Sequence, residues 1–372
     1  MATLYSYSRV GSFFTCPTQY AHRYIHKTPS PSPQGIELFM GSRFHDAMEF
    51  LYGELPKRLP DLPEVLSKFD QAWSDSFKEV QSRQKQQGYE TPLRINREGE
   101  TVQDYYERAK SYVESYYGKY APFDQDETLA VEKRVLFSLD PAGQYKMQGY
   151  IDRLSRTPDG TLWVHDYKTG SRKLSEEDAR NEDQLALYQL GLAQDPAFRK
   201  DPVKLAWHFV AFEDDTVQSE RGEKELDFLK KKYVNKIQAI EKAKDFAPLT
   251  SALCGWCDFL KLCPDGQKAV AQRAERKAKA EGTQAKDPIA GGRVVSKPVT
   301  TAKKAAKETK TPVEPQVIKG GETSPDDVAG KKNRNQQDEA PASTPTTPTV
   351  GRRKKSRPVS VDQMDFFGPS RT

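Results

Sequence analysis

Two aspartates and a lysine lie near the ends of two neighbouring segments with strand-like patterns. Asp152 belongs to the sequence GYIDR, and Asp166 and Lys168 belong to VHDYKTG. Because side chains alternate along a strand, Asp166 and Lys168 point to the same face, and a hairpin can bring Asp152 beside them. Paired carboxylates suit Mg²⁺ or Mn²⁺. Such an ion activates water to hydrolyse a phosphodiester, with the lysine as base or electrostatic aid. Taken alone, Asp-x-Lys more often marks a surface ion pair on an edge strand.

Two predicted helices carry polar side chains that can reach the same place. His45 lies in GSRFHDAMEF, on a helix expected over residues 36–55. Gln184 and Tyr188 are four residues apart on a helix expected over 182–194, so they share one face and can hydrogen-bond toward the acidic residues. Each set on its own is compatible with an ordinary structural role. Their value lies in the combination with the two aspartates and the lysine.

All four cysteines fit one ligand pattern, with one thiol far upstream and three close together. They are Cys16, Cys254, Cys257 and Cys263. Four thiolates suit either an iron–sulfur cluster or a zinc ion, and the spacing alone does not separate these two. Four unrelated thiols is the weaker interpretation, because no cysteine is left over. A metal centre here would tie the chain near residue 16 to the chain near residue 260 and so close a loop of the whole domain.

The segments that must position these residues alternate between helical and extended patterns. We expect a short helix within residues 1–27, and then helices over 36–55, 63–87 and 101–120. Turn signals separate strands expected over 128–139, 145–155 and 161–168; a helix (182–194), a strand (203–212) and a helix (223–245) follow. This order predicts an α/β fold, with a mixed central sheet flanked by helices and a helical insertion.

Charge and aromatic residues divide the chain near residue 272. The net charge is +5, but residues 273–372 hold 21 Lys and Arg against 12 Asp and Glu, and residues 1–272 hold 37 against 41. Phe366 and Phe367 are the only aromatic residues of the last hundred. A segment so poor in apolar groups cannot offset the entropy of ordering. We therefore expect a folded domain over 1–272 and a disordered basic tail over 273–372.

Membrane and secreted classes are excluded by the same sequence. It has no apolar run of about 18 residues that could span a membrane. The first residues, MATLYSYSRVGSFF, lack the basic and apolar regions of a secretory signal. We expect a cytoplasmic protein without membrane contact, and in a reducing compartment clustered cysteines bind metals more often than they form disulfides.

The order of four motifs resembles the RecB-type branch of the PD-(D/E)XK nuclease superfamily, over roughly residues 3–265. The motifs are G-x-x-x-H at 41–45, G-x-I-D at 149–152, D-Y-K-T-G at 166–170 and Q-x-x-x-Y at 184–188. The resemblance implies a restriction-endonuclease-like fold and Mg²⁺ or Mn²⁺ held by His45, Asp152, Asp166 and the carbonyl of Tyr167. It also implies a catalytic Lys168, with Gln184 and Tyr188 supporting the site or contacting DNA. The usual proline before the first acid is replaced by Ile151.

The cysteine pattern around these motifs is similar to that of AddB-type and CRISPR-adaptation-type nucleases, which implies a 4Fe-4S cluster. The expected function is a metal-dependent DNA exonuclease acting on ends or single strands in recombination, repair or CRISPR adaptation. No P-loop motif is present, so unwinding would need a helicase partner. Two alternatives stay open, which are a non-catalytic DNA-binding subunit and a nuclease that acts only inside a helicase or CRISPR-integration complex.

The far end of the tail carries an isolated apolar peptide. It resembles the pentapeptide by which bacterial proteins bind the sliding clamp, and its residues are Gln363, Met364, Asp365, Phe366 and Phe367. An apolar cluster at the end of a polar arm is more consistent with docking to a partner than with a core. The sliding clamp is therefore an expected partner.

Overall fold

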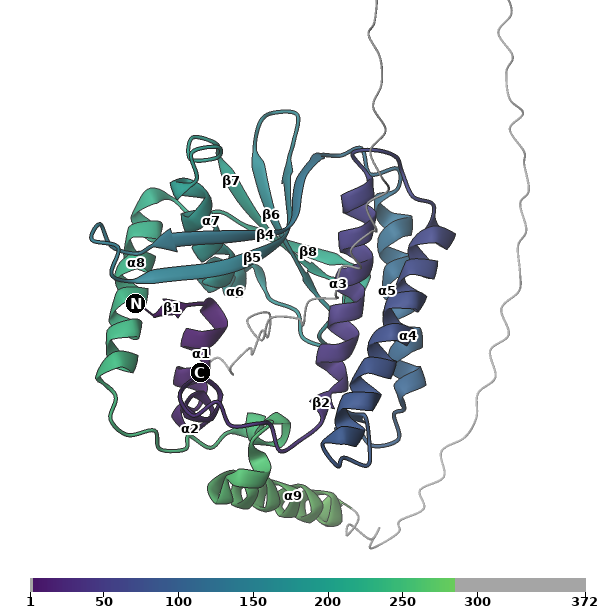
Figure 1. Ribbon diagram of the computed structural model, residues 1–372, viewed down its shortest axis with the longest axis vertical. Coiled ribbons are helices and arrows are strands. Elements are labelled where there is room, and N and C mark those ends of the chain that lie inside the picture. The colour runs from purple at the N-terminus through teal and green to yellow at the C-terminus, as the bar shows by residue number, and fades with distance from the viewer. Residues whose placement is uncertain (1–2, 285–372) are drawn as a thin grey trace, which may run out of the picture. The chain divides into compact units, whose positions relative to one another are not determined.

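A computed structural model of the chain describes residues 3–284, and these form one compact unit (Figure 1). Its centre is a six-stranded mixed sheet with the order β1-β5-β6-β7-β8, in which β4 also pairs with β5. The strands are β1 (Leu4–Tyr5), β4 (Glu127–Ser138), β5 (Lys146–Arg156), β6 (Leu162–Lys168), β7 (Val203–Phe209) and β8 (Asp215–Ser219). β1 runs parallel to β5 and β6 parallel to β7, and the other pairs are antiparallel. The predicted α/β class with a mixed central sheet is confirmed.

Three long helices form a layer beside the sheet, and Figure 1 shows them side by side. They are α3 (Ile36–Glu54), α4 (Leu62–Gln86) and α5 (Val102–Tyr120), and a two-stranded pairing of β2 (Gln34–Gly35) with β3 (Leu93–Arg94) lies near them. The side chain of Asp61 caps α4, and Thr101 and Asp104 form a reciprocal capping box on α5. Buried aromatic residues fill the core of this layer, which we call the helix-layer core: Phe39, Phe44, Phe69, Trp73, Tyr105 and Tyr116.

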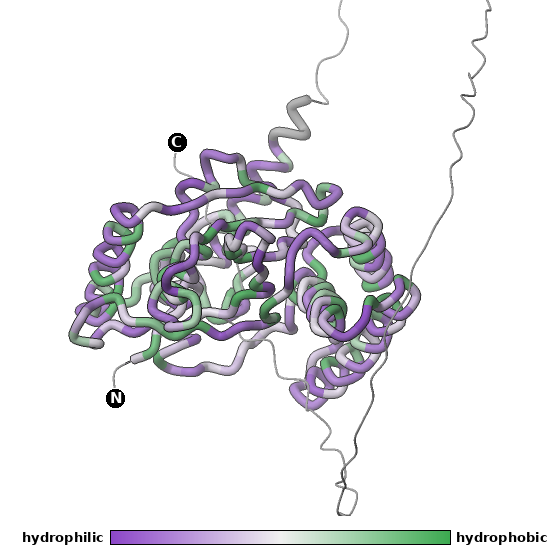
Figure 2. The backbone as a smooth tube through the Cα atoms, turned by 90° about the horizontal axis from the view of Figure 1, so that it is seen from above, coloured by the Kyte–Doolittle hydropathy of each residue, from purple (hydrophilic) through white to green (hydrophobic). Residues whose placement is uncertain are grey.

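A second core fills the other side of the sheet and is called here the sheet core. It joins the sheet to α7 (Gln184–Gln194), α8 (Glu223–Lys242) and α1 (Tyr7–Thr15), with the short α6 (Glu176–Asn181) nearby. Nine of the eleven residues of α7 are buried, so this helix lies inside the fold. Figure 2 shows hydrophobic residues gathered towards the interior, with hydrophilic residues on the outer segments.

The N-terminal segment and the segment that precedes the last helix are built from short helical elements. Pro17 starts a new helix where α1 ends, so the helix expected within 1–27 is divided into α1, α2 (Pro17–Tyr20) and a π-helical turn η1 (Ala21–Ile25). Two 3-10 turns, η3 (Ala252–Trp256) and η4 (Leu260–Leu262), lead to α9 (Pro264–Gln284). α9 runs across residue 272, where the sequence places the domain boundary, and that boundary stays a prediction.

The expected strand 203–212 ends earlier, at Phe209, and a 3-10 turn η2 (Val210–Phe212) leads into β8. β8 was not predicted, because its five residues carry one buried side chain and give no alternating pattern. Within residues 3–284, none of the helices has a stretch long and apolar enough to cross a lipid bilayer.

Candidate active site

At Asp152, the odd-numbered residues of β5 change from facing the sheet core to facing the helix layer. Ile151 belongs to the sheet core, whereas Arg153 lies over the ring of Tyr52 in α3, with 4.1 Å between the guanidinium carbon and the ring centroid. In a regular strand, residues two apart share one face. The pattern is therefore broken at Asp152, which lies between them and is 8% exposed.

β4 breaks its pattern at the same level. Its residues Val131 and Lys133 pair with Arg153 and Ile151, and they divide in the same way. Val131 packs against the helix-layer core, and the Lys133 ammonium lies 3.3 Å from the Asp195 carboxylate just after α7. Glu132 lies between the two with φ of +47°, a left-handed conformation that is uncommon for a residue with a side chain. Both strands thus turn at facing acidic residues.

His45 reaches this place from α3. Its Nε2 lies 3.0 Å from the carbonyl oxygen of Tyr167, and its Nδ1 lies 3.5 Å from Oδ2 of Asp152. The backbone N–H of Tyr167 donates to that same Oδ2 at 2.9 Å. The helix layer, β5 and β6 therefore converge on one point through a side chain, a carboxylate and a backbone carbonyl.

Lys168 lies in a closed set of polar contacts on β6 and α7. Its Nζ is 2.6 Å from Oδ2 of Asp166 and donates to Oε1 of Gln184 at 3.1 Å. The amide nitrogen of Gln184 donates to Oδ1 of Asp166 at 3.3 Å and to the Tyr188 hydroxyl at 3.2 Å. Asp166 and Lys168 are 5% and 6% exposed, so this is a buried ion pair and not the surface pair of an edge strand.

Two motif glycines make room for these contacts. A Cβ on Gly149 would lie 2.1 Å from Cε1 of Tyr188, so the tyrosine packs directly on the bare backbone of β5. A Cβ on Gly41 would lie 3.0 Å from the hydroxyl oxygen of Thr169, which follows Lys168. The glycines of G-x-I-D and G-x-x-x-H thus let the α7 and α3 elements approach the strands that carry the acids.

Burial and like charge shift the protonation of this site. Burial raises the pKa of Asp152 to about 6; the nearby Asp166 adds to the rise, and His45 opposes it. Burial alone would lower the pKa of His45, but the carboxylates of Asp152, Glu132 and Asp166 outweigh it and raise the value. The site concentrates negative charge in a poorly hydrated place, which a divalent cation would neutralise.

The donor set fits Mg²⁺ or Mn²⁺. One ligand atom each from His45, Glu132 and Asp152 can be chosen so that all lie within 4.8 Å of one another. Octahedral ions with bonds of about 2.1 Å place neighbouring ligands about 3.0 Å apart and opposite ligands about 4.2 Å apart. His45 Nε2 and the Tyr167 oxygen, which are hydrogen-bonded at 3.0 Å, are thus already at the separation of two neighbouring ligands.

Sequence reasoning missed two acidic residues of this site. Glu132 has no motif around it, and only the break in its strand brings it to His45. Glu182 precedes α7, accepts from the backbone N–H of Gln184 at 2.6 Å and hydrogen-bonds the side chain of Tyr7. Burial raises the pKa of Glu182 to about 6, and the charge of Lys168 opposes the rise. The sequence signal that could have identified Glu182 is its position, two residues before the glutamine of the Q-x-x-x-Y motif.

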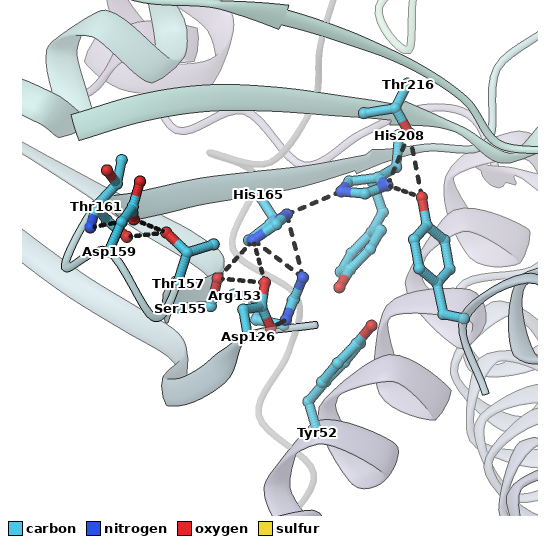
Figure 3. A network of polar contacts seen from close by, with 12 residues as sticks. Tyr52, Asp126, Arg153, Ser155, Thr157, Asp159, Thr161, His165, His208 and Thr216 are labelled. Carbon is cyan, nitrogen blue, oxygen red and sulfur yellow. Dashed lines mark hydrogen bonds and ion pairs between the residues drawn. The ribbon is translucent and has the colours of Figure 1, made fainter. Parts of the chain in front are cut away.

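A buried polar network supports the opposite face of β5, β6 and β7 (Figure 3). His165 Nδ1 lies 2.9 Å from Nε2 of His208, and Arg153 donates to Asp126 at 2.6 Å. The hydroxyl of Ser155 also donates to Asp126, at 2.7 Å. Burial and the charge of Arg153 hold the pKa of His165 well below its usual value. This network fixes the strands that carry the site against the helix layer.

The four cysteines, one near the start and three near the end of the described chain, line one pocket. Cys16 precedes α2, Cys254 lies in η3, and Cys257 and Cys263 follow η3 and η4. Backbone N–H groups of Ser251 and Gly266 donate to the sulfurs of Cys254 and Cys263, each at 3.3 Å. All four are free thiols.

Burial and the neighbouring thiols make the Cys257 thiol harder to ionise. Burial raises its pKa to about 11, and the neighbouring Cys16 and Cys254 add to the rise. A thiolate there needs a positive partner, and a metal centre supplies one. The donor set and the N–H groups directed at sulfur fit a thiolate-bound metal centre.

A sequence profile of the PD-(D/E)XK nuclease superfamily matches residues 5–264, which carry the acidic site and all four cysteines. The chain belongs to this superfamily. Its members are metal-dependent nucleases that use Mg²⁺ or Mn²⁺, and His45, Glu132 and Asp152 form a possible metal site in the part of the chain that the structure describes.

Solved structures resemble the chain at low sequence identity. One is a candidate exonuclease from Eubacterium rectale, at 11% identity and a TM-score of 0.39, with 80% of this chain and 91% of that chain covered. Another is SSO0001, at 19% identity and a TM-score of 0.28, with 44% and 78% covered. No curated protein is detectably similar to the chain.

Of the predicted site residues, His45 lies against Asp152 and the Tyr167 carbonyl, and Asp166 lies in the adjoining contacts of Lys168, Gln184 and Tyr188. The four predicted cysteine ligands line one pocket. The predicted partner-binding residues Gln363 to Phe367 lie outside the described residues. Several arginines and lysines that could contact DNA are engaged within the fold. Arg9 lies over two tyrosine rings, Arg23 pairs with Asp258, Arg43 pairs with Asp46, and Lys173 pairs with Asp215.

Proposed function

We propose that this superfamily member is a DNA exonuclease of the RecB type that hydrolyses phosphodiester bonds at ends or in single strands. The observation that carries the proposal is the buried Lys168–Asp166 pair, held by Gln184 beside His45 and Asp152. Burying a lysine and two carboxylates costs folding free energy, and a catalytic role explains why the fold retains them. Recombination, repair and CRISPR adaptation are the processes in which such an enzyme would act.

The residues divide the work between binding and proton handling. His45, Asp152, Asp166 and the Tyr167 carbonyl would hold Mg²⁺ or Mn²⁺, which when bound supplies a Lewis acid and lowers the pKa of water. Lys168 Nζ, fixed by Asp166 and Gln184, orients the attacking water or stabilises charge at the phosphate. Tyr188 fixes Gln184 in turn.

A digestion assay tests this proposal. End-labelled linear duplex, single-stranded DNA and closed circular DNA are incubated with the purified full chain in Mg²⁺ or Mn²⁺. We expect loss of linear and single-stranded DNA from the ends, survival of closed circles, and no cleavage by Lys168→Ala. Cleavage of closed circles would identify an endonuclease instead. Inactivity of the unaltered chain alone would favour the non-catalytic or complex-dependent subunit.

We propose that the cysteine pocket holds a 4Fe-4S cluster. The support is the four-thiol lining, the N–H groups directed at two sulfurs and the resemblance of the spacing to cluster-bearing nucleases. Protein purified without oxygen should be brown and contain about four iron and four sulfide per chain. A colourless protein with one zinc per chain would overturn the cluster and leave a structural zinc site.

We propose that residues 363–367 bind the bacterial sliding clamp, with helicase or CRISPR-integration proteins as further partners. The support is the match of Gln363, Met364, Asp365, Phe366 and Phe367 to the clamp-binding pattern. A pull-down with purified clamp should lose the chain when Gln363 and Phe367 are both changed to Ala, whereas Ser360→Ala should bind normally. Equal capture of the double variant would refute the interaction.

A further inference from the structure

We propose that Glu132 is an additional carboxylate ligand, on the His45 side, for the divalent cation of the acidic site. Glu132 is absent from the ligand set that the motifs imply, and its role as a ligand rests on the proposed nuclease function. Glu132 comes from β4, His45 from α3 and Asp152 from β5, and one ligand atom of each lies within 4.8 Å of the other two. Three separate elements thus present an imidazole and two carboxylates to one place.

The backbone of β4 is organised around this carboxylate. Val131 pairs with Arg153 and Lys133 pairs with Ile151, so Glu132 stands opposite Asp152 in the antiparallel register. Its φ of +47° lies in the left-handed region, and the strand changes face there. A glycine would adopt this conformation at less cost. The chain places a glutamate where a glycine fits better, and its carboxylate lies among the ligands.

The charge of the site explains why a further carboxylate is useful. Asp166 is shared, because its Oδ2 pairs with Lys168 and its Oδ1 accepts from Gln184. Asp152 accepts from the N–H of Tyr167 and faces His45. A hard divalent cation is bound more tightly as carboxylate ligands are added. Glu132 gives the cation a carboxylate that lies on a different strand from the one that carries the catalytic lysine.

The test is Mn²⁺ binding to the full chain, measured by calorimetry and by the electron paramagnetic resonance signal of free Mn²⁺. We expect Glu132→Gln to raise the dissociation constant about tenfold or more. Glu127→Gln, on an exposed residue of the same strand, is the matched control and should bind as the unaltered chain does. Asp152→Asn serves as the reference for the acidic site itself.

A glycine variant separates a ligand from a structural role. Glu132→Gly keeps the left-handed backbone and removes the carboxylate. We expect its metal-free melting temperature to be equal or higher and its Mn²⁺ affinity to fall as in Glu132→Gln. A fall in the melting temperature with unchanged Mn²⁺ affinity would overturn the inference, and so would loss of folding in both variants.

The two proposals fail in different ways. If Asp152→Asn abolishes binding and Glu132→Gln does not alter it, the cation site stands and Glu132 is not a ligand. If the unaltered chain and Asp152→Asn bind Mn²⁺ equally, the acidic site holds no cation and the proposed nuclease function fails with it. In the expected case, a higher Mn²⁺ concentration restores DNA hydrolysis by Glu132→Gln but not by Lys168→Ala.

Discussion

The acidic site and the cysteine pocket collect their ligands by different means. The proposed ligands of the acidic site come from α3, β4, β5 and β6, elements whose packing also makes the two cores. The proposed ligands of the cysteine pocket lie within or beside short helical turns, and all four cysteines are partly exposed. The fold therefore positions the first site without help from a cation. At the second site, neither η3 nor η4 has a buried residue.

The contacts around the cysteine turns include partly exposed ion pairs and a ring stack. Asp258 receives Arg23 at 3.0 Å and Arg94 at 3.1 Å, and the ring of Phe259 stacks on His22. Partly exposed ion pairs of this kind contribute about 1 kcal/mol or less each. A metal centre shared by four thiolates should contribute more, because it closes a loop of more than two hundred residues.

The largest expected effect is on the rate of catalysis, in a variant that keeps the acidic site and the cysteine pocket able to bind metal. Lys168→Ala should lower the rate of DNA hydrolysis by about 10³-fold or more. The substitution removes the ammonium group that would orient the attacking water or stabilise charge at the phosphate. Mn²⁺ affinity should not fall, because the carboxylates remain and Asp166 loses its competing partner, and the absorbance of the cysteine pocket should not change. The control is Lys204→Ala, an exposed lysine on β7. A fall below tenfold would mean that Lys168 serves structure more than chemistry.

The next effect reverses the comparison, because it acts on stability. Cys254→Ser should remove the visible absorbance of the metal centre and lower the melting temperature by roughly 5–10 °C. The acidic site of that variant should still bind Mn²⁺, since its ligands lie on other elements. Thermal unfolding followed by circular dichroism, with metal content measured on the same sample, checks both statements. An unchanged melting temperature would show that the turns are held without a metal.

Much of this arrangement is readable from the sequence, and the exceptions have physical causes. Asp166 and Lys168 follow strand alternation, so their shared face could be predicted. The helix of Gln184 and Tyr188 could be predicted, because apolar residues run through Gln184–Gln194 between polar flanks. Glu132 could not be found, since the left-handed turn that aims it is decided by packing between β4 and two layers. Tertiary packing overrides local pattern at such places.

Titration of Asp152 should measure how much stability the fold loses by burying the acidic site. Burial raises the pKa of its carboxyl to about 6, so the folded state holds this proton up to a higher pH than the unfolded state does. In the absence of divalent cations, the free energy of unfolding should therefore fall as pH rises from about 4 to above 6. The contribution is up to about 3 kcal/mol.

The measurement is urea unfolding at several pH values in a chelator, for the unaltered chain and for Asp152→Asn. The variant should be the more stable of the two above pH 6 and should lose the advantage near pH 4. The raised pKa of His45 acts in the same direction at higher pH, because its stabilising charge is lost as pH rises through the raised value. Parallel pH profiles for the two proteins would contradict this account.

The smallest expected effect tests whether the fold alone positions the acidic site. Gly149→Ala places a Cβ 2.1 Å from Cε1 of Tyr188, so the ring must move and carry Gln184 with it. Overpacking of this kind should cost about 2 kcal/mol of unfolding free energy and lower DNA hydrolysis, with the cysteine pocket unchanged. Gly118→Ala, where nothing lies within 4 Å on an exposed turn of α5, should instead be neutral or stabilising by roughly 0.5–1 kcal/mol. Equal stability and activity of the two alanine variants would mean that the site tolerates movement of α7.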